Sequence, residues 1–195
     1  AKYELISGLV GKRIAIINAD NDKTSQMIKW AKKDRCTVWV FTKKRTPSVP
    51  ADKLFSAVNI YADLEGISFD VVVGKECESV SAKVLGEHQV SNILAAIAGA
   101  VAAGMSLKDA AKAACNIQSF TKTLKLIPGI NGSIYINDTF NNNPDAAKAA
   151  LAVLAKVQGR KILVFQPMIE LGSYTRESHR DVGREAGKVC DDIIL

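Results

Sequence analysis

The stretch KRIAIINADND, residues 12–22, decides the fold class, because an Ile-rich run ends abruptly in a cluster of Asp and Asn. This pattern is typical of a buried strand that leads into a polar loop. Residues 24–33 then show mixed helical spacing of their apolar side chains, and CTVWVFT at 36–42 returns to β-branched and aromatic residues. The order strand, helix, strand indicates an α/β fold.

Before residue 116 we expect two further strands and two helices. The strands are expected at 56–61 and 68–73, the second in a small antiparallel layer. The helices are expected at 90–103 and 106–114 and should pack as a hairpin, with Gly104 ending the first and Ser106 capping the second.

A polar stretch at 116–123 has neither the helical nor the strand period and is the candidate linker between two domains. Beyond it the predicted elements are a strand at 133–136, a helix at 145–157, a strand at 161–165, a helix at 176–189 and the onset of a strand at 192–195. This run of βαβαβ units predicts a parallel sheet whose ligand crevice lies at the carboxyl ends of its strands.

Composition excludes several classes of protein. The chain has 195 residues, of which 48% are hydrophobic and 24% charged, and no apolar run approaches the roughly 20 residues that span a bilayer. The N-terminus has neither a signal-peptide nor a transit-peptide pattern, and its sequence is that of a chain entered in mid-helix. We therefore expect a folded protein without a membrane span.

Cysteine and charge patterns argue against zinc and nucleic acid. Four separated cysteines and two histidines give no zinc spacing, so reduced thiols in a cytoplasmic protein are expected. Much of the net charge of +6 lies at 29–45 among strand-like residues, which indicates a solvated basic face. No RNA- or DNA-binding signature accompanies it, so no nucleic-acid partner is predicted.

Three polar loops stand at helix starts or strand ends. In GEHQVSN, residues 86–92, His88 and Asn92 are four apart and share a helix face, so they could bind a base edge or an anion, or only cap the helix. NDTFNNNPD at 137–145 could orient ribose hydroxyls, an amine or a metal-bound water, or form a turn and a cap. QPMIELG at 166–172 follows a strand and is uninformative alone.

Five motifs occur together: AKYELI from residue 1, NADND from 18, GEHQVSNILAAIA from 86, NDTFNNNPDAAKAAL from 137 and MIELGSYTRESHRDVGREA from 168. In this order and at this spacing the chain resembles the Mur ligases over essentially its whole length. The resemblance implies an α/β fold, with residues 1–118 as the C-terminal part of the central ATPase domain. Residues 119–195 would be the N-terminal part of a Rossmann-like C-terminal domain.

The resemblance also implies an activity. The chain is similar to the branch of this family that adds D-alanyl-D-alanine to a UDP-muramoyl peptide in peptidoglycan synthesis. The implied reaction forms an amide bond through an acyl phosphate and uses ATP and Mg²⁺. The P-loop pattern G-x-x-x-x-G-K-[ST] is missing, as is the domain that holds the UDP-sugar, so the chain alone is expected to be inactive. A non-catalytic ligase-like binding protein and a folylpolyglutamate or cyanophycin type of ligase are the alternatives.

Site residues follow from the resemblance, position by position. Lys2 matches the lysine that is carbamylated into a metal-bridging carboxylate, which makes it a catalytic and metal-binding residue. His88 and Asn92 match an adenine-contacting pair, and Asp138 matches an acidic residue near the ribose, with a cofactor-binding and catalytic role. Lys122 stands where an Arg of the family approaches the nucleotide phosphates. The expected substrate-binding residues are Phe140, Asn141 and Asn143.

Several motif positions depart from the family pattern while the apolar framework remains. Where the family usually has a Gly-Arg pair, this chain has Thr121-Lys122-Thr123-Leu124. The point charge of Lys122 does not reproduce the planar fork of an Arg. Further departures are Gln89 for Asn, Asn137 for Asp, Phe140 for Tyr and Gln166-Pro167 for Gly-Asp. These changes cluster in functional loops and are compatible with a specialised or weakened ligase.

Overall fold

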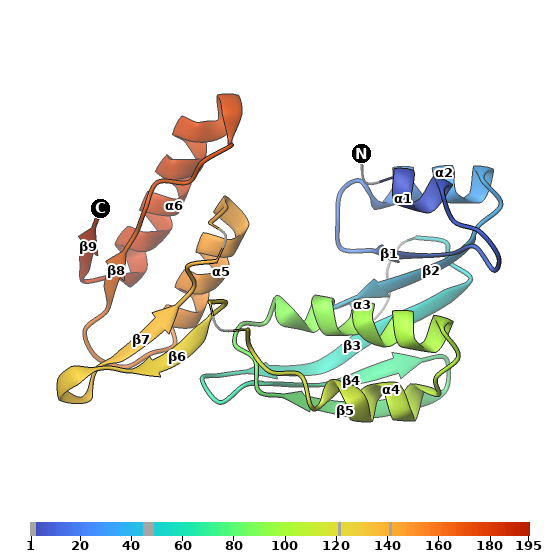
Figure 1. Cartoon of the computed structure of the whole chain (residues 1–195), viewed down its shortest axis with the longest axis horizontal. Helices are drawn as coiled ribbons and strands as arrows, with labels where there is room; N and C mark the ends of the chain where they lie inside the picture. Colours follow the sequence, from blue (N-terminus) through green and yellow to red (C-terminus); the bar gives the residue numbers. More distant parts are fainter. Residues whose placement is uncertain (1–2, 45–48, 121, 141) are drawn as a thin grey trace. The chain divides into compact units, whose positions relative to one another are not determined.

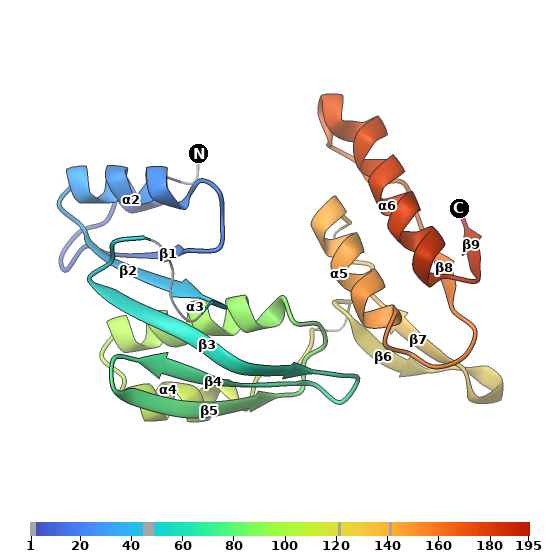
Figure 2. The same cartoon turned by 180° about the vertical axis from the view of Figure 1, so that it is seen from behind.

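The computed structural model describes residues 3–44, 49–120, 122–140 and 142–195, and Figures 1 and 2 show it from opposite sides. The chain divides into two compact units. The first comprises Ala1–Tyr61, Ile67–Ala82 and His88–Ile117, and the second Ala62–Gly66, Lys83–Glu87 and Gln118–Leu195. Two short segments of the first half thus belong to the second unit, and the predicted domain boundary between residues 118 and 119 stays a prediction.

The first unit is built on a five-stranded sheet in the order β1-β2-β3-β4-β5. β1, β2 and β3 are parallel, whereas β4 and β5 form an antiparallel hairpin, as expected for this layer. β5 is not predicted from the sequence, because only Val80 and Ala82 of this edge strand are buried. The strands are β1 (Ile14–Asn18), β2 (Thr37–Thr42), β3 (Lys53–Ala62), β4 (Ile67–Val73) and β5 (Glu76–Ala82).

Four helices accompany this sheet: α1 (Glu4–Ser7), α2 (Thr24–Lys33), α3 (Gln89–Ala102) and α4 (Leu107–Ala114). α2 packs on β1 and β2 through a core of buried side chains, which includes Ile17, Ile28 and Val38. α3 contacts β1, β2 and β4, and it packs against α4 as the predicted hairpin (Figure 1). The expected cap is confirmed, because the Ser106 hydroxyl accepts a hydrogen bond from the Asp109 N–H at 3.0 Å.

The second unit contains two small sheets and two long helices. β6 (Lys125–Pro128) and β7 (Ile134–Asn137) pair antiparallel, while β8 (Ile162–Val164) and β9 (Asp192–Ile194) pair in parallel. The helices are α5 (Pro144–Leu154) and α6 (Thr175–Val189), and short 3₁₀ turns occur at η1 (Ile130–Gly132) and η2 (Gly172–Tyr174).

The predicted parallel sheet in this half is only partly correct. β8 and β9 are parallel as expected, but among the described residues β7 pairs with β6 and not with β8. A tight turn explains the pairing of β7 with β6, because Asn131 and Gly132 have φ values of 52° and 76° and return the chain directly beside the strand before them. β6 is not predicted from the sequence, since KLIP is only four residues long and ends in a proline.

Two apolar clusters stabilise the second unit. The first joins α5, α6 and the loop after β8 through Ala147, Leu151, Met168, Val182 and Ala186. The second contains Leu85, Leu124 and Val153, with Leu64 and Leu126 packed against it. The side-chain ammonium of Lys156 also donates to the carbonyl of Ala62 at 2.5 Å. Segments 62–66 and 83–87 are therefore part of this core.

No helix formed by the described residues is both long and apolar enough to cross a membrane. This finding agrees with the absence of a long apolar run in the sequence.

We predict that Leu85→Ala destabilises the second unit selectively, because Leu85 is 6% exposed and packs with Leu124 and Val153. The free energy of unfolding of that unit should fall by about 2–5 kcal/mol, the usual effect of removing a buried Leu side chain. In native-state hydrogen exchange, amides of β6, β7 and α5 should lose protection while those of β1 and β2 keep it. Ile28→Ala, in the core of the first unit, is the matched control with the reverse pattern, and equal loss in both units would contradict the assignment.

Candidate functional site

The start of α3 carries the predicted base-contacting pair. His88 immediately precedes the helix, and the side-chain amide of Asn92 donates to the side-chain oxygen of Gln89, Oε1, at 2.9 Å. Asn92 is exposed, whereas His88 and Gln89 are half-buried. Buried Val90 and Leu94 fix the helix against the sheet, so the polar first turn has a defined position. Because a side-chain amide carries two N–H donors, Asn92 keeps one for a base while the other is used by Gln89.

The NADND motif after β1 ties two strand ends together. One carboxylate oxygen of Asp20 accepts from the Thr42 hydroxyl at 2.6 Å, and the other accepts from the Lys43 N–H at 2.8 Å. The hydroxyl of Thr24, the first residue of α2, donates to the Asn18 carbonyl at 2.6 Å. The motif thus satisfies buried polar groups at the edge of the sheet.

The loop after β7 brings several predicted residues of the second unit together. Asp138 accepts from the Leu124 N–H at 3.2 Å, and the Phe140 N–H donates to the Lys122 carbonyl at 3.1 Å. The rings of Phe120 and Phe140 meet edge to face, with their centroids 6.1 Å apart. Lys122, Asp138 and Phe140 therefore lie in one place, and both phenylalanine rings remain exposed.

Asn143 has a structural role that the alternative interpretation of this loop anticipated. Its side-chain oxygen accepts from the N–H groups of Asp145 and Ala146 at 3.1 and 2.9 Å, so Asn143 is the N-cap of α5. Pro144 occupies the first turn, where no amide donor is needed. Its neighbour Asn142 donates to the Gln166 carbonyl at 3.0 Å and joins this loop to the loop after β8. Asn141, a predicted substrate residue, lies outside the described residues.

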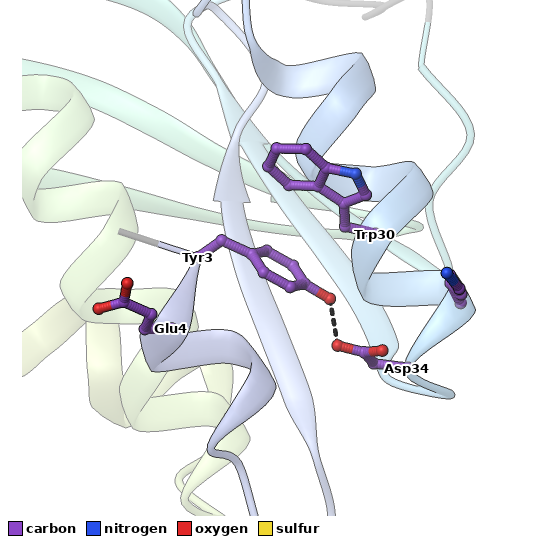
Figure 3. A pocket seen from close by; sticks show the side chains of 5 residues that line it. Tyr3, Glu4, Trp30 and Asp34 are labelled. Atoms are coloured by element: carbon purple, nitrogen blue, oxygen red, sulfur yellow. Dashed lines mark hydrogen bonds between the residues drawn. The ribbon is translucent and has the colours of Figure 1, made fainter. Parts of the chain in front are cut away.

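A separate pocket of about 370 Å³ lies in the first unit, lined by Tyr3, Glu4, Trp30, Lys33 and Asp34 (Figure 3). The Tyr3 hydroxyl donates to the Asp34 carboxylate, and the Tyr3 and Trp30 rings meet edge to face at 5.0 Å. Lys2, the predicted carbamate, directly precedes Tyr3 in the sequence but lies outside the described residues.

The described residues do not provide a cluster of side chains for Mg²⁺. Within the part of the chain that the structure describes, no three His, Cys, Asp or Glu side chains are grouped so that they could hold a metal ion. A phosphate cradle of the P-loop type is likewise not encoded in the sequence.

Sequence reasoning missed two parts of this arrangement. Asn142 lies within the motif at 137–145, but the sequence indicates no role for it, because its partner Gln166 lies 24 residues further along the chain. Tyr3 and Asp34 are 31 residues apart and share no motif, so no local signal marks their contact.

The Tyr3 phenol gives a pH-dependent test of the pocket. Partial burial, and next the hydrogen bond and charge of Asp34, raise the pKa of Tyr3 to about 12. Because the folded-state pKa is raised above its ordinary value of 10.0, the stability that Tyr3 contributes is present below pH 10 and is lost as the pH rises toward 12. The difference between the tyrosinate absorbance titrations of the wild type and Tyr3→Phe should have its midpoint near pH 12. A midpoint near pH 10 would show that the contact does not form.

Comparisons with known proteins place the whole chain in one family. The model described as "Mur ligase middle domain" matches residues 1–100, and that described as "Mur ligase, glutamate ligase domain" matches residues 124–195. A UDP-N-acetylmuramoyl-tripeptide--D-alanyl-D-alanine ligase of Escherichia coli (strain K12) is 32% identical over 198 residues, covering 100% of this chain and 42% of the relative.

Solved structures agree with the sequence matches. A crystal structure of MurF from Acinetobacter baumannii superposes with a TM-score of 0.86 at 29% identity, over 99% of this chain and 40% of that one. MurF of Thermotoga maritima in complex with ADP shares the fold, with a TM-score of 0.78 at 18% identity over 98% of this chain and 42% of that one. The chain therefore spans about two fifths of the length of the relatives it matches. Because the first family model alone covers half of the chain and the second follows it in order, the chain belongs to the Mur ligase family.

Proposed function

We propose that this chain is the central-to-C-terminal segment of an ATP-dependent ligase that adds D-alanyl-D-alanine to a UDP-muramoyl peptide in peptidoglycan synthesis. In this reaction a substrate carboxylate takes the γ-phosphoryl group of ATP, releasing ADP. The amine then attacks the carbonyl carbon of the acyl phosphate, loses a proton and expels phosphate. The chain would contribute loops that hold the base, the ribose and the incoming amine.

One observation carries this proposal: the relative of Escherichia coli that bears this activity in its name aligns with the entire chain at 32% identity. The structural likeness to MurF of Acinetobacter baumannii over 99% of the chain supports the same branch. This favours the D-alanyl-D-alanine branch over a ligase of the folylpolyglutamate or cyanophycin type.

Each unit carries residues that we propose to contact the nucleotide. His88 and Asn92 would contact the adenine edge, and their place at the start of α3 supports this role. Asp138 would lie near the ribose, and Lys122 would replace an Arg near the phosphates. The two hydrogen bonds that link segment 122–124 to segment 138–140, one to the Asp138 carboxylate and one between backbone groups, support a shared role for these two residues.

The substrate-binding residues and the metal are proposed from the resemblance to the Mur ligase family. Phe140 is exposed and Asn143 caps α5 with its oxygen, so the Asn143 amide NH₂ group is the part that would meet substrate. Asn141 is a further proposed substrate-binding residue, and Lys2, as a carbamate, is the proposed metal-binding residue. The described residues do not by themselves fit a Mg²⁺ site, and we derive no step through the metal.

The proposed ligase acts on small molecules in the cytoplasm and needs no nucleic acid. Its P-loop and the domain for the UDP-sugar would come from segments outside this sequence. The 195 residues alone are therefore expected to lack ligase and ATPase activity, because the groups that hold the transferred phosphoryl group are missing.

We predict that the chain alone binds nucleotide chiefly through the adenine end, because the P-loop is missing and the exposed ammonium of Lys122 adds little affinity in water. Each neutral hydrogen bond contributes about 0.5–1.5 kcal/mol, so the affinity should be in the high micromolar range or weaker. In an NMR titration, adenosine and ATP should shift the amides at the start of α3 with similar affinities, and Asn92→Ala should weaken both. Asn59→Ala, on β3 of the same unit, is the control with unchanged binding. ATP binding much tighter than adenosine and indifferent to Asn92 would place the nucleotide elsewhere.

Ligase activity itself is tested with a chimera in which this chain replaces the matching 42% of the Escherichia coli relative. ADP formation that requires both the UDP-muramoyl tripeptide and D-alanyl-D-alanine is expected, and Asp138→Ala should abolish it. The same graft from the Haemophilus influenzae ligase, 30% identical to this chain, controls for the joints. An active control graft beside a folded, nucleotide-binding but inactive chimera would instead favour the non-catalytic binding protein.

A further inference from the structure

Both ring nitrogens of His179 make hydrogen bonds to backbone groups. His179 lies in the second turn of α6, and its Nδ1 is 2.7 Å from the Thr175 carbonyl oxygen one turn earlier. Its Nε2 accepts from the Met168 N–H at 2.9 Å. Met168 belongs to the loop 166–172 that follows β8, so one half-buried imidazole joins this loop to α6.

The two partners fix the tautomer of the imidazole. The Met168 N–H can only donate, so Nε2 must carry a lone pair and not a proton. The Thr175 carbonyl can only accept, so the single proton of the neutral ring lies on Nδ1. Neither the other tautomer nor the doubly protonated ring can make both bonds.

The loop that His179 holds is constrained at three further points. The Met168 side chain is 3% exposed and packs between α5 and α6. Glu170 has a φ of 63°, a left-handed conformation that persists only where neighbouring contacts enforce it. The Gln166 carbonyl accepts from the Asn142 side-chain amide at 3.0 Å, which connects the loop to the one that follows β7.

We propose that His179 is a positioning residue that sets the loop after β8 and, through Asn142, its register with the loop after β7. These two loops follow the carboxyl ends of β7 and β8. The path runs from α6 through His179 to Met168, along the backbone to Gln166, and across to Asn142. What the loops bind rests on the proposed function, whereas the contact between them does not.

The test uses the full 195-residue chain labelled with ¹⁵N. Two-bond ¹H–¹⁵N correlations of the His179 ring should show a protonated Nδ1 and an unprotonated Nε2. His179→Gln can place its side-chain oxygen where Nε2 lies and keep the acceptor for Met168, whereas the shorter His179→Asn reaches only the position of Nδ1 and loses it.

Hydrogen-exchange protection of the Met168 amide should fall about tenfold in His179→Asn, the equivalent of one lost hydrogen bond, and stay near the wild-type value in His179→Gln. The Asn142 side-chain NH₂ resonances should move in His179→Asn and not in His179→Gln. Amides in the last two turns of α6 report whether the helix itself remains folded in each variant.

Three results would overturn the proposal: a proton on Nε2 in the wild type, equal loss of Met168 protection in both variants, or unmoved Asn142 resonances once Met168 has lost its protection. If α6 itself opens in His179→Asn, the wild-type tautomer and the His179→Gln variant decide the question. None of these measurements involves nucleotide or ligation, so their failure is distinct from a failure of the proposed function.

Discussion

Backbone N–H groups at the ends of strands need acceptors, and in both units an aspartate beside a strand end supplies them. Asp20 accepts from the Thr42 hydroxyl and the Lys43 N–H, which ties the end of β1 to the end of β2. Asp138 accepts from the N–H of Leu124, a buried residue with a φ of 43°. An unsatisfied buried amide costs about 1–3 kcal/mol, so these carboxylates determine where the loops begin and hence where the other polar residues of each loop lie.

The remaining motif residues are largely hydrogen-bonded to one another or to the backbone. Asn92 bonds to Gln89, Asn143 caps α5, and Asn142 bonds to Gln166. Such contacts order the loops before any ligand arrives and so reduce the entropy that binding must overcome. They also mean that a ligand would use the donors left over by these internal bonds, which are the second N–H of the Asn92 amide and the NH₂ group of Asn143.

Most elements could be predicted from apolar periodicity, and the helix at 24–33 agrees with α2 to the residue. β5 and β6 could not, because an edge strand with two buried residues and a four-residue strand ending in Pro128 carry too little pattern. The pairing of β7 with β6 could not be predicted either, because it depends on a turn at 129–132 rather than on the strand itself. The candidate site residues came from motifs, and the local cap formed by Asn143 could be predicted with them. The contacts of Asn142 with Gln166 and of Asp138 with Leu124 join more distant positions, and no local pattern encodes them.

In the proposed ligase, Lys122 would stand where an Arg of the family approaches the nucleotide phosphates, and this difference would affect the turnover. Lys122 is exposed, and its carbonyl accepts a hydrogen bond from the Phe140 N–H, so the backbone at this position is held while its side chain is open to solvent. A lysine keeps the positive charge but loses the planar fork that orients a phosphate through two parallel hydrogen bonds. The attraction of Lys122 for a phosphate would thus be retained more fully than the alignment of that phosphate. Because phosphoryl transfer depends mainly on positioning and on preorganised charge, this exchange is expected to lower turnover more than nucleotide affinity.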